Sequence, residues 1–242
     1  MRRAVTLNLK NYQRTGFTLA EVLITLGIIG VVAAMTLPAL IQKNNNKVVE
    51  TRLKKFYSSI NQAIMMAEVD YGDKKVWYQD LTGASFDEEG NIIEGSSEIE
   101  KWCKKYLMPY MKVIRTGTLS NGAFIMYFED GSALSPDDGY SRDWYFYPGN
   151  PEKCIDQYGD DIGGLGKCKW GFIFNPANAE SGWKYHYNKG MDPYKAGWDG
   201  DKNKLYRGAT YSCETGNGLY CTAIIQNNNW TIPDDYPFKV SY

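Results

Sequence analysis

The stretch GFTLAEVLITLGIIGVVAAMTLPAL, residues 16–40, decides how the rest of the chain is organised. It contains one carboxylate, Glu21, and no charged side chain from Val22 to Leu37. About 20 apolar residues suffice to cross the hydrocarbon core of a bilayer as a helix. Because this segment is apolar on every side, lipid or neighbouring helices must surround it. We therefore expect a membrane-spanning helix over residues 17–41.

The leader that precedes this helix is basic. Residues 1–16 contain no acid and four basic side chains, namely Arg2, Arg3, Lys10 and Arg14. Basic flanks stay on the cytoplasmic side, so we expect a single-pass protein of the cytoplasmic (inner) membrane with its N-terminus inside and its C-terminus outside. A secretory signal peptide has the same order of segments, but this apolar run is long for one and leads into Pro38 and a helical pattern rather than an obvious cleavage site.

Glu21 is unexplained by either a signal peptide or a plain membrane anchor. A carboxylate inside an apolar span costs about 2.5 to 3.5 kcal/mol on insertion scales. A residue retained at that cost is expected to have a function and a partner of opposite charge.

Six residues of this region resemble the N-terminal signature of type IV pilins and type II secretion pseudopilins: Gly16, Phe17, Thr18, Leu19, Glu21 and Pro38. In that family a membrane peptidase cuts after the glycine and methylates the new N-terminus. The resemblance implies a cut between Gly16 and Phe17 and an N-methylated Phe17. It also implies that Glu21 pairs with the terminal amine of a neighbouring subunit and that the helix bends at Pro38.

The resemblance implies a structural subunit that polymerises into a type II secretion pseudopilus or a type IV pilus. Its partners would be other pilin or pseudopilin subunits, the prepilin peptidase and an inner-membrane assembly platform. The product would be an extracytoplasmic filament. The signature says nothing about the task of the exposed domain.

Composition fits an exported chain with one globular domain. Of the 27 Lys and Arg residues four lie in the leader, which leaves 23 against 28 Asp and Glu, a net charge of −5. A mildly acidic surface argues against strong nonspecific binding of nucleic acid. The residues beyond the first helix are enough for one hydrophobic core.

The helix is expected to continue past the membrane as an amphipathic segment over residues 42–72. Its apolar residues recur at helical spacing: Val49, Leu53, Phe56, Ile60, Ile64 and Ala67. The pattern stops at Tyr71 and Gly72. Pro38 and the run Asn44–Asn46 are weak points of this helix. They indicate a bend at the membrane surface, while the resemblance to pilins implies a zone that melts as the filament forms or stretches, and both can hold.

Residues 73–242 are expected to form the exported globular domain. Residues 73–96 are polar and read as loop, and Ser97 with Glu100 forms a capping box for a helix that Pro109 ends. Asp130 and Gly131 signal a hairpin turn. The expected strands cover residues 112–115, 122–129, 132–134 and 169–174. This order indicates an α+β fold with a long N-terminal helix, short antiparallel strands and long disulfide-stapled loops. The resemblance to pilins implies that the helix packs on the small antiparallel β-sheet.

Five cysteines occur in this outward-facing chain. We favour the local pairs Cys154 with Cys168 and Cys213 with Cys221, although four cysteines allow three pairings. Cys103 lies on the apolar face of its helix and is expected to be a core thiol, with a disulfide or a reactive nucleophile as alternatives. Without a CxxC motif and with a single histidine, we expect no zinc site.

Asp199, Asp201 and Asn203 place oxygen side chains at alternate positions, as a calcium loop does. The sixth and twelfth positions of an EF-hand are Lys204 and Thr210 here instead of Gly and Glu. Some major pseudopilins hold calcium in a C-terminal loop, which keeps calcium as an alternative. We expect a solvated turn and no cofactor.

We expect no enzyme and no catalytic residue. His186 stands among tyrosines without a Ser or Cys partner, and GxSxG, HExxH and P-loop patterns are missing from the sequence. An alternative function is a minor pilin that binds DNA during uptake, or a surface or glycan. Residues 140–147 with Trp170, Trp183 and Trp198 would then form an aromatic platform beside local lysines. The simpler interpretation of these aromatic residues is apolar packing.

Overall fold

Helix α1 (Leu19–Tyr71) dominates the computed structural model, which describes residues 16–77, 81–119, 121–137, 140–159 and 162–242. The chain divides into two compact units, Met1–Ile41 and Gln42–Tyr242, and α1 contributes to both. In the first unit the apolar part of α1 is long enough to cross a membrane, and the most apolar window of the helix has no buried residue. A helix that is apolar all round and unburied needs lipid or other helices.

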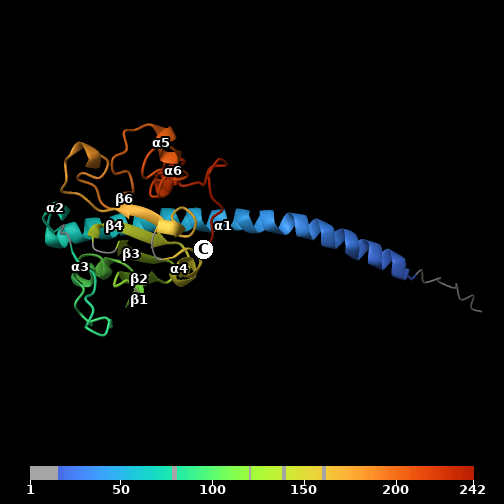
Figure 1. The fold of residues 1–242 in the computed structure, drawn as a ribbon, viewed down its shortest axis with the longest axis horizontal. Helices are drawn as coiled ribbons and strands as arrows, with labels where there is room; N and C mark the ends of the chain where they lie inside the picture. Colours follow the sequence, from blue (N-terminus) through green and yellow to red (C-terminus); the bar gives the residue numbers. More distant parts are fainter. Residues whose placement is uncertain (1–15, 78–80, 120, 138–139, 160–161) are drawn as a thin grey trace, which may run out of the picture. The chain divides into compact units, whose positions relative to one another are not determined.

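The second unit is built on one antiparallel sheet in which each strand pairs with the next along the chain (Figure 1). Its strands are β1 (Val113–Thr118), β2 (Phe124–Phe128), β3 (Ala133–Asp137), β4 (Tyr140–Tyr147), β5 (Trp170–Ile173) and β6 (Asp192–Pro193). The short helices are α2 (Lys74–Trp77), α3 (Glu98–Tyr106), α4 (Pro151–Tyr158), α5 (Lys202–Tyr206) and α6 (Cys221–Asn227). Three 3₁₀ turns complete the described elements: η1 (Met108–Tyr110), η2 (Ile162–Gly164) and η3 (Ser181–Trp183).

The second part of α1 packs on one face of this sheet. Its apolar stripe is buried as the helical spacing predicts, and Phe56 stacks on Phe146 of β4 with ring centroids 4.2 Å apart. Phe172 of β5 meets the same ring edge-on at 5.0 Å. These contacts fix α1 to the middle of the sheet.

A second core covers the opposite face of the sheet. Neighbouring residues of β2 divide between the two cores, since Met126 belongs to the core under α1 and Ile125 and Tyr127 to the other. The second core also contains both disulfides and most of the buried side chains of α6. The sheet is therefore a middle layer with apolar contacts on both faces.

The α+β class, the long helix and the antiparallel sheet are confirmed. The hairpin turn at Asp130 and Gly131 joins β2 to β3, and Ser97 caps α3 by accepting a hydrogen bond from the Glu100 backbone N–H at 3.2 Å. The Glu100 carboxylate pairs with Lys104 at 2.7 Å.

Some details differ from the predictions or decide between them. Residues 74–77 form a helical turn, α2, within the segment 73–96 that the sequence predicts to be mostly loop with a short edge element. Residues 140–147 form the central strand β4, and Trp144 and Phe146 are buried in it, so they cannot belong to a surface platform. Trp170 is buried as well.

Candidate functional site

The start of α1 holds Glu21 in a reciprocal arrangement with Thr18. The Glu21 backbone N–H donates to Thr18 Oγ1 at 3.3 Å. Glu21 Oε2 in turn accepts from the Thr18 backbone N–H at 2.8 Å and from Thr18 Oγ1 at 2.7 Å. This is a capping box, in which the two residues satisfy each other's polar groups at a helix N-terminus. The T-x-x-E spacing was a readable signal for it that sequence reasoning missed.

Only one of the two oxygens of the Glu21 carboxylate, Oε2, accepts these hydrogen bonds. Within the described part of the chain, no residue hydrogen-bonds to its other oxygen, Oε1. Thr18 is neutral, so it orients the carboxylate without cancelling its charge. The arrangement can therefore accept a cationic donor from outside the chain.

The residues just before α1 are accessible. Phe17 is 89% exposed, and nothing lies within 4 Å of the position that a side chain on Gly16 would occupy. Both residues precede the first helical residue, Leu19. The peptide bond between them is open to another protein.

Helix α1 runs through its two weak points without a break. Pro38 lies inside it, and Asn44–Asn46 are helical. A proline in this position removes one backbone donor from the helix. The bend at Pro38 stays a prediction.

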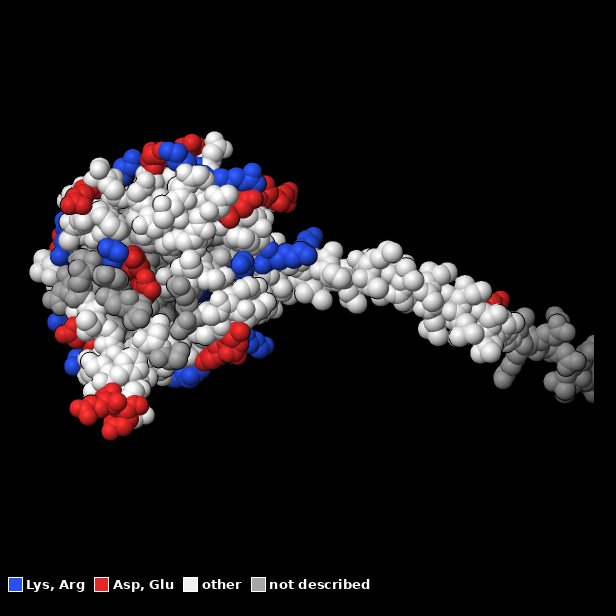
Figure 2. Space-filling model, in the orientation of Figure 1, with Lys and Arg blue, Asp and Glu red and all other residues white. Residues whose placement is uncertain are grey.

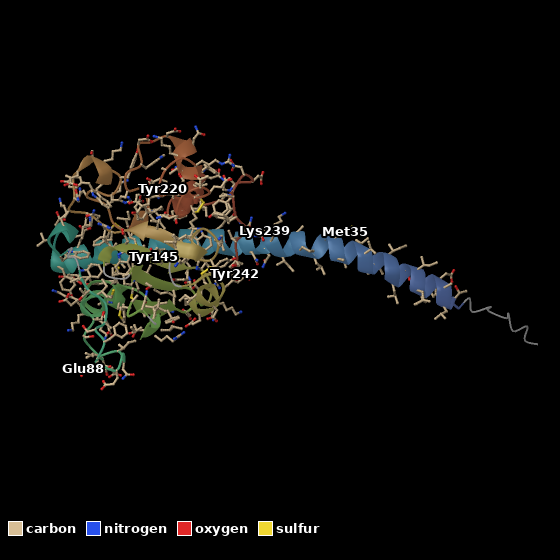
Figure 3. The ribbon with its side chains drawn as sticks, in the orientation of Figure 1. Met35, Glu88, Tyr145, Tyr220, Lys239 and Tyr242 are labelled. Carbon is tan, nitrogen blue, oxygen red and sulfur yellow. A yellow bond between two sulfur atoms is a disulfide. The ribbon has the colours of Figure 1, made fainter. Side chains whose placement is uncertain are left out.

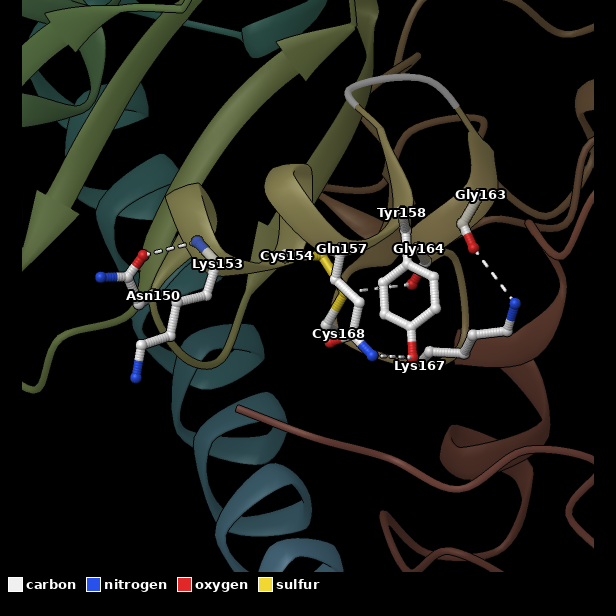
Figure 4. Close-up of a disulfide and its surroundings, with 9 residues drawn as sticks. All are labelled: Asn150, Lys153, Cys154, Gln157, Tyr158, Gly163, Gly164, Lys167 and Cys168. Carbon is white, nitrogen blue, oxygen red and sulfur yellow. Dashed lines mark hydrogen bonds between the residues drawn. A yellow bond between two sulfur atoms is a disulfide. The ribbon is translucent and has the colours of Figure 1, made fainter.

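The cysteines pair as expected from the sequence, Cys154 with Cys168 and Cys213 with Cys221. Figure 4 shows Cys154 on α4, whose first turn is capped by Asn150 accepting from the Lys153 backbone N–H at 2.9 Å. Cys103 is free and buried, and burial raises the pKa of its thiol well above the ordinary value. It is a core thiol, since the thiolate is the reactive form.

The two carboxylates of the calcium candidate, Asp199 and Asp201, are engaged within their own loop. Asp199 accepts from the Asp201 backbone N–H at 3.0 Å and pairs with Lys204 at 2.5 Å. Asp201 caps α5 by accepting from the Asn203 backbone N–H at 2.9 Å. Among the described residues no group of three or more His, Cys, Asp or Glu is placed to hold a metal ion. These bonds are typical of a solvated turn and a helix cap.

His186 is a buried packing residue. Its Nε2 accepts from the Lys195 backbone N–H at 3.1 Å, and burial lowers its pKa to about 4. Lys195 is itself buried and pairs with Asp192 at 2.8 Å. Neither residue is exposed to a ligand.

Only two tryptophans of the proposed aromatic platform reach the surface. Trp183 is partly buried beneath the Arg142 guanidinium, 4.8 Å from the ring centroid. Trp198 is partly buried against Tyr185, and its indole N–H donates to the Asp201 carbonyl at 2.7 Å. Both rings already serve packing within the domain.

Two family models match the chain. The prokaryotic N-terminal methylation motif covers residues 12–37. A family of unknown function (DUF6613) covers residues 39–240, which is most of the chain. The chain belongs to the DUF6613 family. No curated protein and no solved structure matches it.

The methylation motif is the signature of type IV pilins and pseudopilins, and it makes this DUF6613 chain a pilin-like precursor. That signature belongs to structural subunits rather than to enzymes. Together with a long apolar N-terminal helix, it fits a single-pass protein anchored in the inner membrane.

Proposed function

We propose that this DUF6613 protein is a prepilin-like structural subunit that polymerises into a type II secretion pseudopilus or a type IV pilus. The observation that carries the proposal is the methylation motif over residues 12–37, which runs into an apolar, unburied helix with Glu21 in its first turn. A prepilin peptidase cuts between Gly16 and Phe17 and methylates the new amine of Phe17.

The parts of the chain then have separate tasks. Residues 1–16 are the cytoplasmic leader that is removed. Residues 17–41 anchor the subunit in the membrane and later pack it into the filament. Residues 42–72 continue the helix into the exported domain, residues 73–242. An inner-membrane assembly platform and other pilin subunits are the partners of the mature chain.

Cleavage after Gly16 creates a charged amine on Phe17, and this amine favours assembly. In an apolar surrounding, the amine of Phe17 and the carboxylate of Glu21 would each be costly without a partner. Thr18 holds Glu21 Oε2, and Oε1 remains for the amine of the neighbouring subunit. Helix packing contributes most of the assembly energy, and this ion pair sets the register between subunits.

Processing can be tested by expressing the chain together with a prepilin peptidase and measuring the N-terminus by mass spectrometry. We expect a mature chain that begins at Phe17 and carries one added methyl group. The Gly16→Val variant should stay uncut, because its branched side chain would fill space that is open in the chain and that the peptidase needs to reach the bond between residues 16 and 17. A mature chain that begins elsewhere, or without the methyl group, would contradict the proposal.

A binding role as a minor pilin for DNA or a glycan is the weaker proposal. Trp183 and Trp198 remain partly exposed, but Trp170 and Lys195, which would extend the platform, are buried. Saturable binding of single-stranded DNA or a glycan that is lost in the Trp183→Ala, Trp198→Ala double variant would support it.

A further inference from the structure

Strand β1 lies at one edge of the sheet and pairs only with β2 among the described strands. The Leu119 backbone N–H donates to the Ala123 carbonyl, which fixes the alternation of hydrogen-bonded and non-bonded pairs along the two strands. By that alternation Gly117 bonds to β2, while Thr116 and Thr118 direct their backbone N–H and C=O groups away from it. Within the described part of the chain, no other backbone group pairs with these two residues.

A groove of about 330 Å³ runs beside this open edge. The groove is lined by Thr116 and Thr118 of β1, by the loop with Ile92, Ile93 and Glu94, and by α3 and its N-cap with Ser97, Glu100 and Lys104. Ile92 and Ile93 are 37% and 45% exposed, so the loop offers apolar surface next to the free backbone groups. Natural edge strands are usually covered or interrupted. The bulge between Val113 and Arg115 interrupts β1, but it lies before Thr116.

The loop that forms the groove is acidic. Residues 81–97 contain no Lys or Arg, and their acids are Asp87, Glu88, Glu89 and Glu94. Figure 2 shows acidic side chains gathered at the protruding end of the domain, where Figure 3 labels Glu88. Among the described residues that line the groove, the one cation, Lys104, is paired with Glu100 at 2.7 Å. The field in the groove is therefore negative.

We propose that this groove binds an extended, basic segment of another polypeptide, which adds to the sheet as a strand beside β1. Strand addition uses backbone hydrogen bonds for affinity and alternate side chains for specificity. Here Thr116 and Thr118 supply the backbone groups, Ile92 and Ile93 the apolar contact, and Glu94 the attraction for Lys or Arg.

The partner is a different chain rather than a second copy of this one. Two copies paired edge to edge through β1 would be related by a two-fold axis, which makes the same patch face itself. Both acidic loops would then lie at one interface, where like charges repel. The groove belongs to the second unit, and its binding depends neither on peptidase cleavage nor on assembly.

The probe is a fluorescent hexapeptide of alternating Lys and Val, titrated against the full chain in detergent micelles. We expect saturable binding, together with slower hydrogen exchange at the Thr116 and Thr118 amides. The same peptide with every backbone amide N-methylated cannot pair as a strand, and we expect it to bind at least about tenfold more weakly. Equal binding of the two peptides, or no binding, would overturn the proposal.

Variants of the chain separate strand addition from general charge attraction. Glu94→Lys should weaken binding about tenfold, whereas Glu89→Lys, the same change on the same loop outside the groove, should alter it less than about twofold. Thr116→Pro removes one outward N–H that does not serve the pairing with β2, a place where an edge strand tolerates proline. It should also weaken binding about tenfold. Equal losses in Glu94→Lys and Glu89→Lys would overturn the proposal, even if Thr116→Pro fails to fold.

Discussion

At the scale of single residues, Thr18 orients Glu21, and among the described residues none hydrogen-bonds to the second oxygen of its carboxylate. The proposed pairing with another subunit uses that oxygen. Inserting this carboxylate into a membrane costs free energy because it lies in an apolar helix. The capping box with Thr18 explains how the carboxylate is oriented. His186 shows the opposite case, a titratable side chain whose burial serves packing. The chemistry of each residue thus depends on which groups surround it.

The buried His186 predicts how stability depends on pH. Burial lowers its pKa to about 4 from 6.5. Between these values the unfolded chain binds a proton that the folded chain does not, so stability falls as pH falls through that window. Nearby charges change the pKa of His186 less than burial does: Asp192 raises it, and Lys195 and Lys189 lower it.

The measurement is the free energy of unfolding at several pH values for the unaltered chain and for His186→Gln. The unaltered chain should lose up to about 3 kcal/mol more than the variant between pH 6.5 and pH 4, since one pKa unit corresponds to about 1.4 kcal/mol. Parallel pH profiles would show that His186 is not held neutral by burial.

Gly166 predicts a steric requirement next to a disulfide. A side chain there would overlap Cys221 Sγ, and the backbone φ of +74° already disfavours other residues. Gly131 has a similar φ of +79° but open space around it. Gly166→Ala should therefore cost about 1 to 3 kcal/mol more than Gly131→Ala in thermal unfolding. Equal losses would mean that backbone conformation alone explains both glycines.

At the scale of elements, the second part of α1 behaves as its periodicity predicts, because one face meets an apolar sheet and the other meets water. Strand β4 was missed for a physical reason. Both faces of the sheet are buried, so Trp144, Tyr145 and Phe146 show no alternation of polar and apolar residues. Strand β6 is two residues long and contains Pro193, which leaves little pattern to recognise.

The contact between α1 and the sheet predicts a large effect of one truncation. Phe56 is 4% exposed and stacks on Phe146, so Phe56→Ala should lower the free energy of unfolding by about 3 to 5 kcal/mol. Val69, on the same helix, is 85% exposed, and Val69→Ala should change it by less than about 0.5 kcal/mol. A small loss in Phe56→Ala would contradict the packing of α1 described above.

At the scale of the whole molecule, two family models divide the chain into a processing and assembly segment, residues 12–37, and a much larger domain, residues 39–240. The first could be recognised from sequence, because its residues, among them Gly16, Phe17 and Glu21, stand at fixed spacing within one short segment. The edge groove beside Thr116 could not, because β1 and the acidic loop meet only in the folded sheet. The same holds for the burial of Lys195 beside Asp192.

The most direct test of the account is the incorporation of Glu21→Ala into filaments, in cells that contain the prepilin peptidase and the assembly machinery. Thr36→Ala is the matched control. It alters a polar side chain of the same helix whose hydroxyl donates to the helix carbonyls of Val32 and Ala33. We predict that both variants are cut after Gly16 and methylated at Phe17, that Thr36→Ala enters filaments, and that Glu21→Ala does not. Filaments that contain Glu21→Ala at the level of the unaltered chain would contradict the account.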